Sequence, residues 1–75
     1  MYLIDLYHAR NEIYARHGRM FSDPSLQDYF NSKTWYNPQY SPSEFDSMPS
    51  PLSDIERKNS DLMLQIEREQ NSPYI

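Results

Sequence analysis

The chain has 75 residues, contains no cysteine and carries a formal net charge of −4. A chain of this length forms one small domain, so we expect residues 1–75 to be a single domain with a limited core. The absence of cysteine excludes disulfide scaffolds, thiol catalysis and thiolate metal ligands. The acidic balance argues against nucleic acid as a partner.

We expect neither a transmembrane stretch nor a signal peptide within this segment. Its apolar runs are too short to cross a bilayer, and Met1 leads directly into an amphipathic helical pattern. A chain that opens inside a helix pattern is typical of a domain excised from a longer protein, which is what we expect here. Aromatic residues make up 15% of the chain, so we expect large flat side chains to build the core.

The first predicted helix runs from about Leu3 to His17 and stops at Gly18, the only glycine, which suits a left-handed position after a helix. Its predicted outer face carries Glu12 and Arg16 as an i,i+4 ion pair. The predicted inner face is unusual because it places Arg10 and His17 among apolar residues. That face consists of Leu3, Leu6, Tyr7, Arg10, Ile13, Tyr14 and His17.

A second short helix is predicted from Pro24 to about Lys33, behind an Asp or Ser cap. Residues 34–51 contain four prolines and several aromatics, which predicts an irregular loop with one helical turn after Ser41. The last helix is predicted over residues 54–70, with a capping box at its start, and residues 71–75 are predicted to be a frayed tail. Its predicted buried stripe is Ile55, Asn59, Leu62 and Ile66, with Met63 beside it.

These elements predict an all-α fold: a small single domain of about three helices, with a proline- and aromatic-rich loop packed between the second and last helix. Three polar residues, Arg10, His17 and Asn59, fall in predicted buried stripes. A buried guanidinium requires a partner, and Glu56 is the first candidate for Arg10, with Asp46 and Asp54 behind it. One interpretation is therefore a structural polar clamp formed by Arg10, His17, Glu56 and Asn59.

The alternative interpretation is a shallow site for a ligand that bears a carboxylate, lined by Arg10, Tyr14, His17, Tyr36 and Tyr40. A peptide terminus or a cell-wall stem peptide has this chemistry. The aromatic loop also permits sugar stacking, although Trp35 is expected to belong to the core and Tyr36 and Tyr40 to be more exposed. We favour the structural interpretation.

Metal binding and catalysis find little support in the sequence. His8 and His17 are nine residues apart, so they point to opposite sides of one helix and do not converge on a metal. A phosphate-binding loop needs several glycines, and no nucleophile-elbow pattern occurs. We predict no metal and no cofactor. The alternative from another class is a hydrolase or transferase fragment with His17 as general base and Arg10 as anion clamp.

Four segments together resemble the YARHG domain, a small bacterial family mostly found in exported or membrane-attached proteins. They are A-R-N-E-I-Y-A-R-H-G-R-x-F at 9–21, L-Q-x-Y-F at 26–30, W-Y-x-P at 35–38 and E-x-x-N-x-x-L at 56–62. The resemblance implies an extracytoplasmic or envelope-associated accessory module without an established activity. We therefore expect a non-catalytic binding module, not an enzyme, whose partner is a cell-wall component, a peptide or a neighbouring protein domain.

Overall fold

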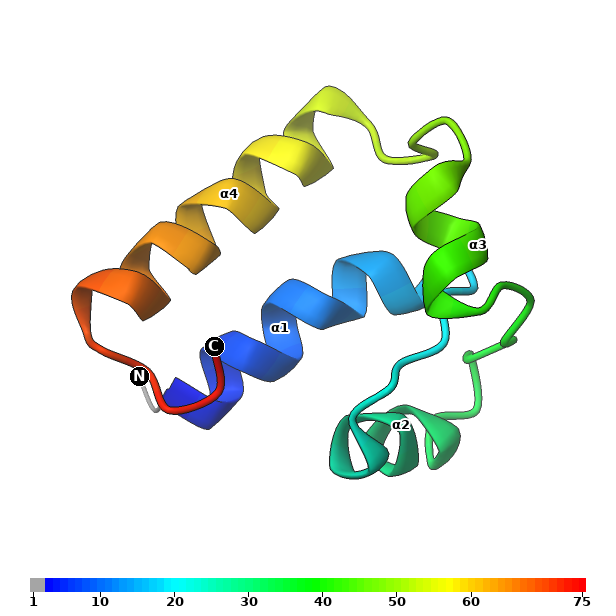
Figure 1. The fold of residues 1–75 in the computed structure, drawn as a ribbon, viewed down its shortest axis with the longest axis horizontal. Helices are drawn as coiled ribbons and strands as arrows, with labels where there is room; N and C mark the ends of the chain where they lie inside the picture. Colours follow the sequence, from blue (N-terminus) through cyan, green and yellow to red (C-terminus); the bar gives the residue numbers. More distant parts are fainter. Residues whose placement is uncertain (1–2) are drawn as a thin grey trace. The chain divides into compact units, whose positions relative to one another are not determined.

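The computed structural model describes residues 3–75 and contains four helices there, namely α1 (Leu3–Ala15), α2 (Pro24–Asn31), α3 (Pro42–Ser47) and α4 (Asp54–Glu69) (Figure 1). No strand occurs in residues 3–75, where an isolated bridge joins Arg19 and Tyr40. The predicted all-α class is confirmed. There are four helices and not about three because the turn expected after Ser41 is long enough to form α3.

The chain forms two compact units. The first contains the residues up to Ile13 and Leu52–Ile75, and we call it the hairpin unit; the second is Tyr14–Pro51, which we call the loop unit. Helix α1 continues from one unit into the other, so the stretch from Ala9 to Gly18 supplies residues to both.

In the hairpin unit, α1 and α4 lie side by side and run antiparallel (Figure 1). Two contacts fix this direction, because Tyr7 stacks on Tyr74 with ring centroids 5.4 Å apart and Arg10 pairs with Glu67. Helix α4 starts with the predicted capping box: the Ser53 hydroxyl accepts from the Glu56 N–H, and the Glu56 carboxylate accepts from the Ser53 N–H.

Helix α4 is turned by about one residue, or about 100°, from the orientation that its hydrophobic pattern predicts. Ile55 and Leu62 were expected in the buried stripe, yet they are 72% and 56% exposed, and Asn59 is exposed as well. The fully covered residues are instead Ser60 and Glu67. The pattern misled because a paired carboxylate takes an inward position that a hydrophobicity count assigns to leucine or isoleucine.

The last residues, which the sequence predicts to be frayed, make defined contacts in the structure. Asn71 adopts a positive φ of 53°, and the N–H groups of Asn71 and Ser72 donate to the carbonyls of Arg68 and Glu67. This pair of bonds is the Schellman motif that ends many helices. Ser72 is buried, and the ring of Tyr74 then lies on Tyr7.

The predicted left-handed residue after α1 is confirmed at Gly18, which has φ +89°. The Gly18 N–H donates to the Ala15 carbonyl, and the Arg19 N–H donates to the Tyr14 carbonyl, which again gives a Schellman motif. A side chain at position 18 would also be crowded, because an added Cβ would lie 3.2 Å from the Gln39 Cβ and 3.3 Å from the Asn37 carbonyl oxygen.

Aromatic side chains form the core of the loop unit, as the composition predicts. Phe30 is completely buried, and its ring lies within about 6 Å of the rings of Phe21, Tyr29, Trp35 and Tyr36. Helix α2 presents Phe30 and Leu26 inward and begins at Pro24 behind the Asp23 cap. Helix α3 begins with the capping box of Ser41 and buries Phe45.

Candidate functional site

Arg10 lies on the face of α1 that meets α4, and its guanidinium binds the carboxylate of Glu67. The Arg10 Nε donates to Glu67 Oε1 at 2.8 Å, and Nη2 donates to Oε2 at 3.3 Å. The Glu67 side chain is 0% exposed and that of Arg10 is 14% exposed. The Arg10 guanidinium also lies 5.8 Å from the centre of the Tyr7 ring. Two parallel hydrogen bonds give this ion pair a fixed geometry.

The prediction of Glu56 as the first partner of Arg10 is wrong, because the carboxylate that binds Arg10 belongs to Glu67. Glu56 accepts a hydrogen bond from the Ser53 N–H at the start of α4. The two glutamates are eleven residues apart, so they lie on the same face of the helix about 16 Å from each other. The sequence therefore identifies the face that holds the partner but not the register of α4 along α1.

Tyr14–Gly18, the second half of the stretch from Ala9 to Gly18, forms the turn on which the loop unit is built. The Gly18 carbonyl accepts from the N–H groups of Gln39 and Tyr40, at 2.9 and 3.0 Å, and the Met20 N–H donates to the Tyr40 carbonyl at 2.8 Å. The turn thus holds a segment more than twenty residues further along the chain. This is a structural task that the backbone performs, and Gly18 permits it through its positive φ.

The two arginines of the loop unit that flank Gly18 lie against aromatic rings. The Arg16 guanidinium lies 4.2 Å from the centre of the Trp35 ring, and that of Arg19 lies 5.1 Å from the centre of Phe21. Arg19 also forms an ion pair with Asp46 at 3.3 Å. Since Arg16 covers one face of Trp35, that face is not open for stacking on a sugar.

Four of the predicted ligand-binding residues lie in the loop unit and are half-buried: Tyr14, His17, Tyr36 and Tyr40. The Tyr36 hydroxyl donates to the Arg19 carbonyl at 2.7 Å and accepts from Gln27 Nε2 at 3.2 Å. The rings of Tyr14 and Tyr40 both pack against Phe45. Trp35, Tyr36 and Tyr40 are all half-buried, and the expected difference in exposure between them stays a prediction.

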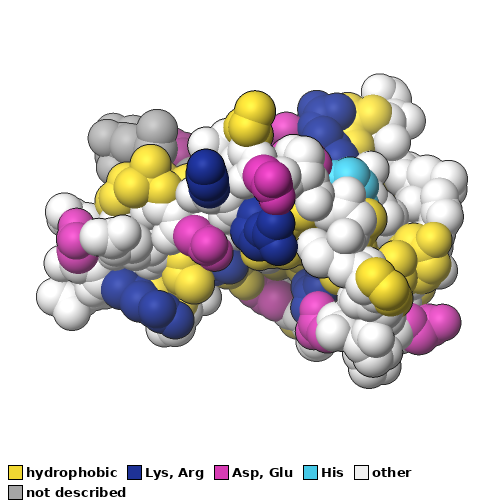
Figure 2. Space-filling model, turned by 90° about the horizontal axis from the view of Figure 1, so that it is seen from above, with side chains coloured by type: hydrophobic (Ala, Val, Ile, Leu, Met, Phe, Trp, Pro, Cys, Tyr) yellow, Lys and Arg dark blue, Asp and Glu magenta, His cyan; other side chains and the backbone are white. Residues whose placement is uncertain are grey.

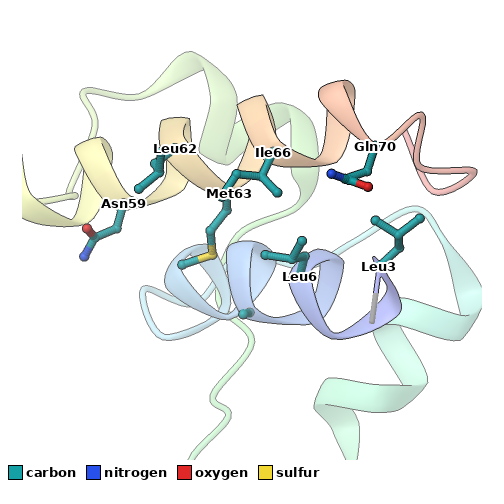
Figure 3. A pocket seen from close by; sticks show the side chains of 8 residues that line it. Leu3, Leu6, Asn59, Leu62, Met63, Ile66 and Gln70 are labelled. Carbon is teal, nitrogen blue, oxygen red and sulfur yellow. The ribbon is translucent and has the colours of Figure 1, made fainter. Parts of the chain in front are cut away.

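The hairpin unit contains a groove that the sequence did not predict. It has a volume of about 680 Å³ and lies between α1 and α4 (Figure 3). Asn59, a predicted member of the polar clamp, is exposed and lies at one end of this groove, and Gln70 lies near the other. The sequence did not indicate the groove because Leu62 and Ile66, which line its α4 side, were predicted to lie in the core.

Electrostatics add few unusual features. The pKa of Glu44 is lowered from its usual 4.5, first because its carboxylate accepts from the Ser41 backbone N–H and then because of the Ser41 side chain. On the face shown in Figure 2, acidic and basic side chains are interspersed, and neither sign forms a continuous patch. Within residues 3–75, no group of three or more His, Asp or Glu residues has the arrangement of a metal site.

The helices of residues 3–75 include none with the length and apolar character that a membrane span requires.

The model of the YARHG domain matches residues 3–68, which is most of the chain and all four segments noted in the sequence. The chain belongs to the YARHG domain family. Neither a curated protein nor a solved structure matches it. In this YARHG domain, the five name-giving residues are Tyr14–Gly18, which form the end of α1 and the turn that follows.

Proposed function

We propose that this YARHG domain is a non-catalytic accessory module that binds a component of the cell envelope outside the cytoplasm. The observation that carries the proposal is the Arg10–Glu67 pair, in which the cation of the Ala9–Gly18 stretch best suited to bind an anion faces an internal carboxylate. Arg16 and Arg19 also contact groups within the domain, namely the rings of Trp35 and Phe21. The motif residues therefore serve mainly to hold the domain in shape.

The enzyme alternative requires Arg10 to grip an anionic substrate beside His17. Both Nε and Nη2 of Arg10 donate to Glu67, so a substrate carboxylate would have to displace a buried glutamate that is already hydrogen bonded. Leaving Glu67 buried without its cation would cost about 3–5 kcal/mol. This cost favours a structural role for Arg10 over a role in anion binding.

The proposed contact residues for the partner are Tyr14, His17, Tyr36 and Tyr40, which are half-buried. Tyrosine suits such a surface because its ring offers apolar area and its hydroxyl offers a polar contact. Part of each tyrosine is already fixed by neighbours within the loop unit, such as Phe45, so the surface needs little ordering when a ligand binds.

The experiment is to incubate the purified domain with purified cell wall and to measure both retention on the wall and release of soluble fragments. The proposal predicts retention without fragment release. Retention should fall in His17→Gln, because His17 belongs to the proposed contact surface, and should stay unchanged in the control His8→Gln at the other histidine. Fragment release that is lost in His17→Gln alone would establish the enzyme alternative. A domain that stays in the supernatant would rule out the cell wall as its partner.

A further inference from the structure

Helix α4 carries two exposed large hydrophobic residues, Ile55 and Leu62, in line with the half-buried Ile66. Ile55 and Leu62 are 72% and 56% exposed, and Ile66 continues their line. The spacings of seven and four residues place all three on one side of the helix. Exposed large apolar residues that are scattered singly are normal, but a line of them along one helix indicates an interaction surface.

The groove between α1 and α4 runs beside this line and extends the apolar surface onto α1 (Figure 3). No charged residue lines it, and its two polar residues, Asn59 and Gln70, lie toward its ends. A partner that fits here presents an apolar helical face. The complete lining is Leu3, Leu6, Ala9, Asn59, Leu62, Met63, Ile66 and Gln70.

Two opposite charges lie beside Leu62 and Ile66, one on each side along the helix. Lys58 and Glu69 are both exposed and lie within about 40° of Leu62 around the helix. The midpoint between Lys58 and Glu69 nearly coincides with the midpoint between Leu62 and Ile66. Gln65 donates to Glu69 Oε1 at 3.2 Å, which holds this carboxylate on the same side. Lys58 has no ion pair within residues 3–75.

This arrangement is complementary to itself. If a second copy of α4 lies antiparallel across the first, Leu62 meets Ile66 of the second copy, and Lys58 meets its Glu69. A twofold axis repeats both contacts, so the interface contains two apolar pairs and two ion pairs, each between a lysine and a glutamate. A parallel pair of α4 helices related by a twofold axis cannot form these ion pairs, because that arrangement places Lys58 of one copy next to Lys58 of the other.

We propose that two copies of this chain associate through antiparallel α4 helices, with Leu62 and Ile66 at the centre and Lys58 paired with Glu69 of the second copy. The groove between α1 and α4 of each copy accommodates apolar side chains of the other copy at the edge of this contact. The proposed interface uses residues of the hairpin unit, whereas the proposed envelope contact uses residues of the loop unit.

Sedimentation equilibrium of the domain, from about 10 µM to about 1 mM, tests the proposal over a range that detects weak association. The expected result is a rise in average mass from one copy toward two, and Leu62→Glu abolishes this rise while far-UV circular dichroism stays unchanged. A domain that remains a single copy throughout the range would overturn the proposal.

A charge exchange distinguishes this geometry from unspecific hydrophobic contact. Lys58→Glu and Glu69→Lys should each weaken association by about tenfold, because two exposed ion pairs become repulsive, and the double variant should restore it. The controls Arg57→Glu and Asp61→Lys make the same changes in charge at exposed positions off the line and should leave association unchanged. Failure of the double variant to recover would overturn the antiparallel pairing.

Discussion

In the hairpin unit most of the buried residues are polar, whereas in the loop unit they are mainly aromatic. The first set is Asn11, Ser60, Glu67 and Ser72, together with Leu6; the second is Phe21, Leu26, Phe30 and Phe45, together with Ala15. The hairpin unit therefore depends on directional contacts such as Arg10–Glu67, and the loop unit on ring packing and on the turn at Gly18. The stretch from Ala9 to Gly18 is thus divided between two different kinds of stabilisation.

The largest expected effect comes from removing the cation of the hairpin unit. Arg10→Met leaves Glu67 fully buried without a partner and should lower the free energy of unfolding by about 3–5 kcal/mol. Urea unfolding followed by circular dichroism measures this loss. A change of less than about 1 kcal/mol would show that Glu67 gains water or another partner, and that the pair does not hold α1 against α4.

In the loop unit the corresponding test is Gly18→Ala. The substituted residue would have to adopt φ near +89° and would meet Gln39 and the Asn37 carbonyl, so we expect a loss of about 1–3 kcal/mol in the free energy of unfolding. Asn71→Gly is the matched control, because Asn71 holds the same position after α4, and it should change stability by less than about 1 kcal/mol. Equal effects of the two variants would contradict the importance of the turn at Gly18.

A smaller effect is expected from the contact between Arg16 and Trp35. Arg16→Gln removes the cation above the indole and should cost about 0.5–1 kcal/mol, since Arg16 is exposed. Trp35 is the only tryptophan, so its fluorescence reports the site directly, and its emission should shift to longer wavelength. Arg16→Lys should retain part of the effect, and an unchanged spectrum in Arg16→Gln would contradict the stacking.

The smallest effect concerns the cap of α3. Because the folded state lowers the pKa of Glu44, its stabilising contribution is complete above the usual value of 4.5 and is lost as the pH falls through the lower folded value. Unfolding measured between neutral and acid pH should therefore show a slightly steeper acid loss in the parent than in Glu44→Gln. Identical pH profiles would show that the cap at Ser41 contributes nothing.

Local signals in the sequence predicted most of the helical architecture. Three signals each determine the start or end of a helix only a few residues away, and the structure confirms all three. They are the capping box at Ser53, the proline after Asp23 and the single glycine at position 18. These signals are reliable because hydrogen bonds between neighbours in sequence determine them.

Contacts between distant segments were predicted less well. The need of Arg10 for a carboxylate was recognised, but the choice between Glu56 and Glu67 depends on the register of two helices that a long connection does not fix. The groove was missed for the same reason, since inward placement of Glu67 turns Ile55 and Leu62 toward solvent. A hydrophobic pattern cannot anticipate a carboxylate that is buried because it is paired.

The central claim is that Arg10 and Glu67 act as one structural unit, and a double-mutant cycle tests it most directly. The free energies of unfolding are measured for the parent, Arg10→Met, Glu67→Met and the double variant. We expect each single variant to lose about 3–5 kcal/mol and the double variant to be more stable than either, because two apolar side chains can occupy the space of the pair. Additive losses in the double variant would contradict the claim.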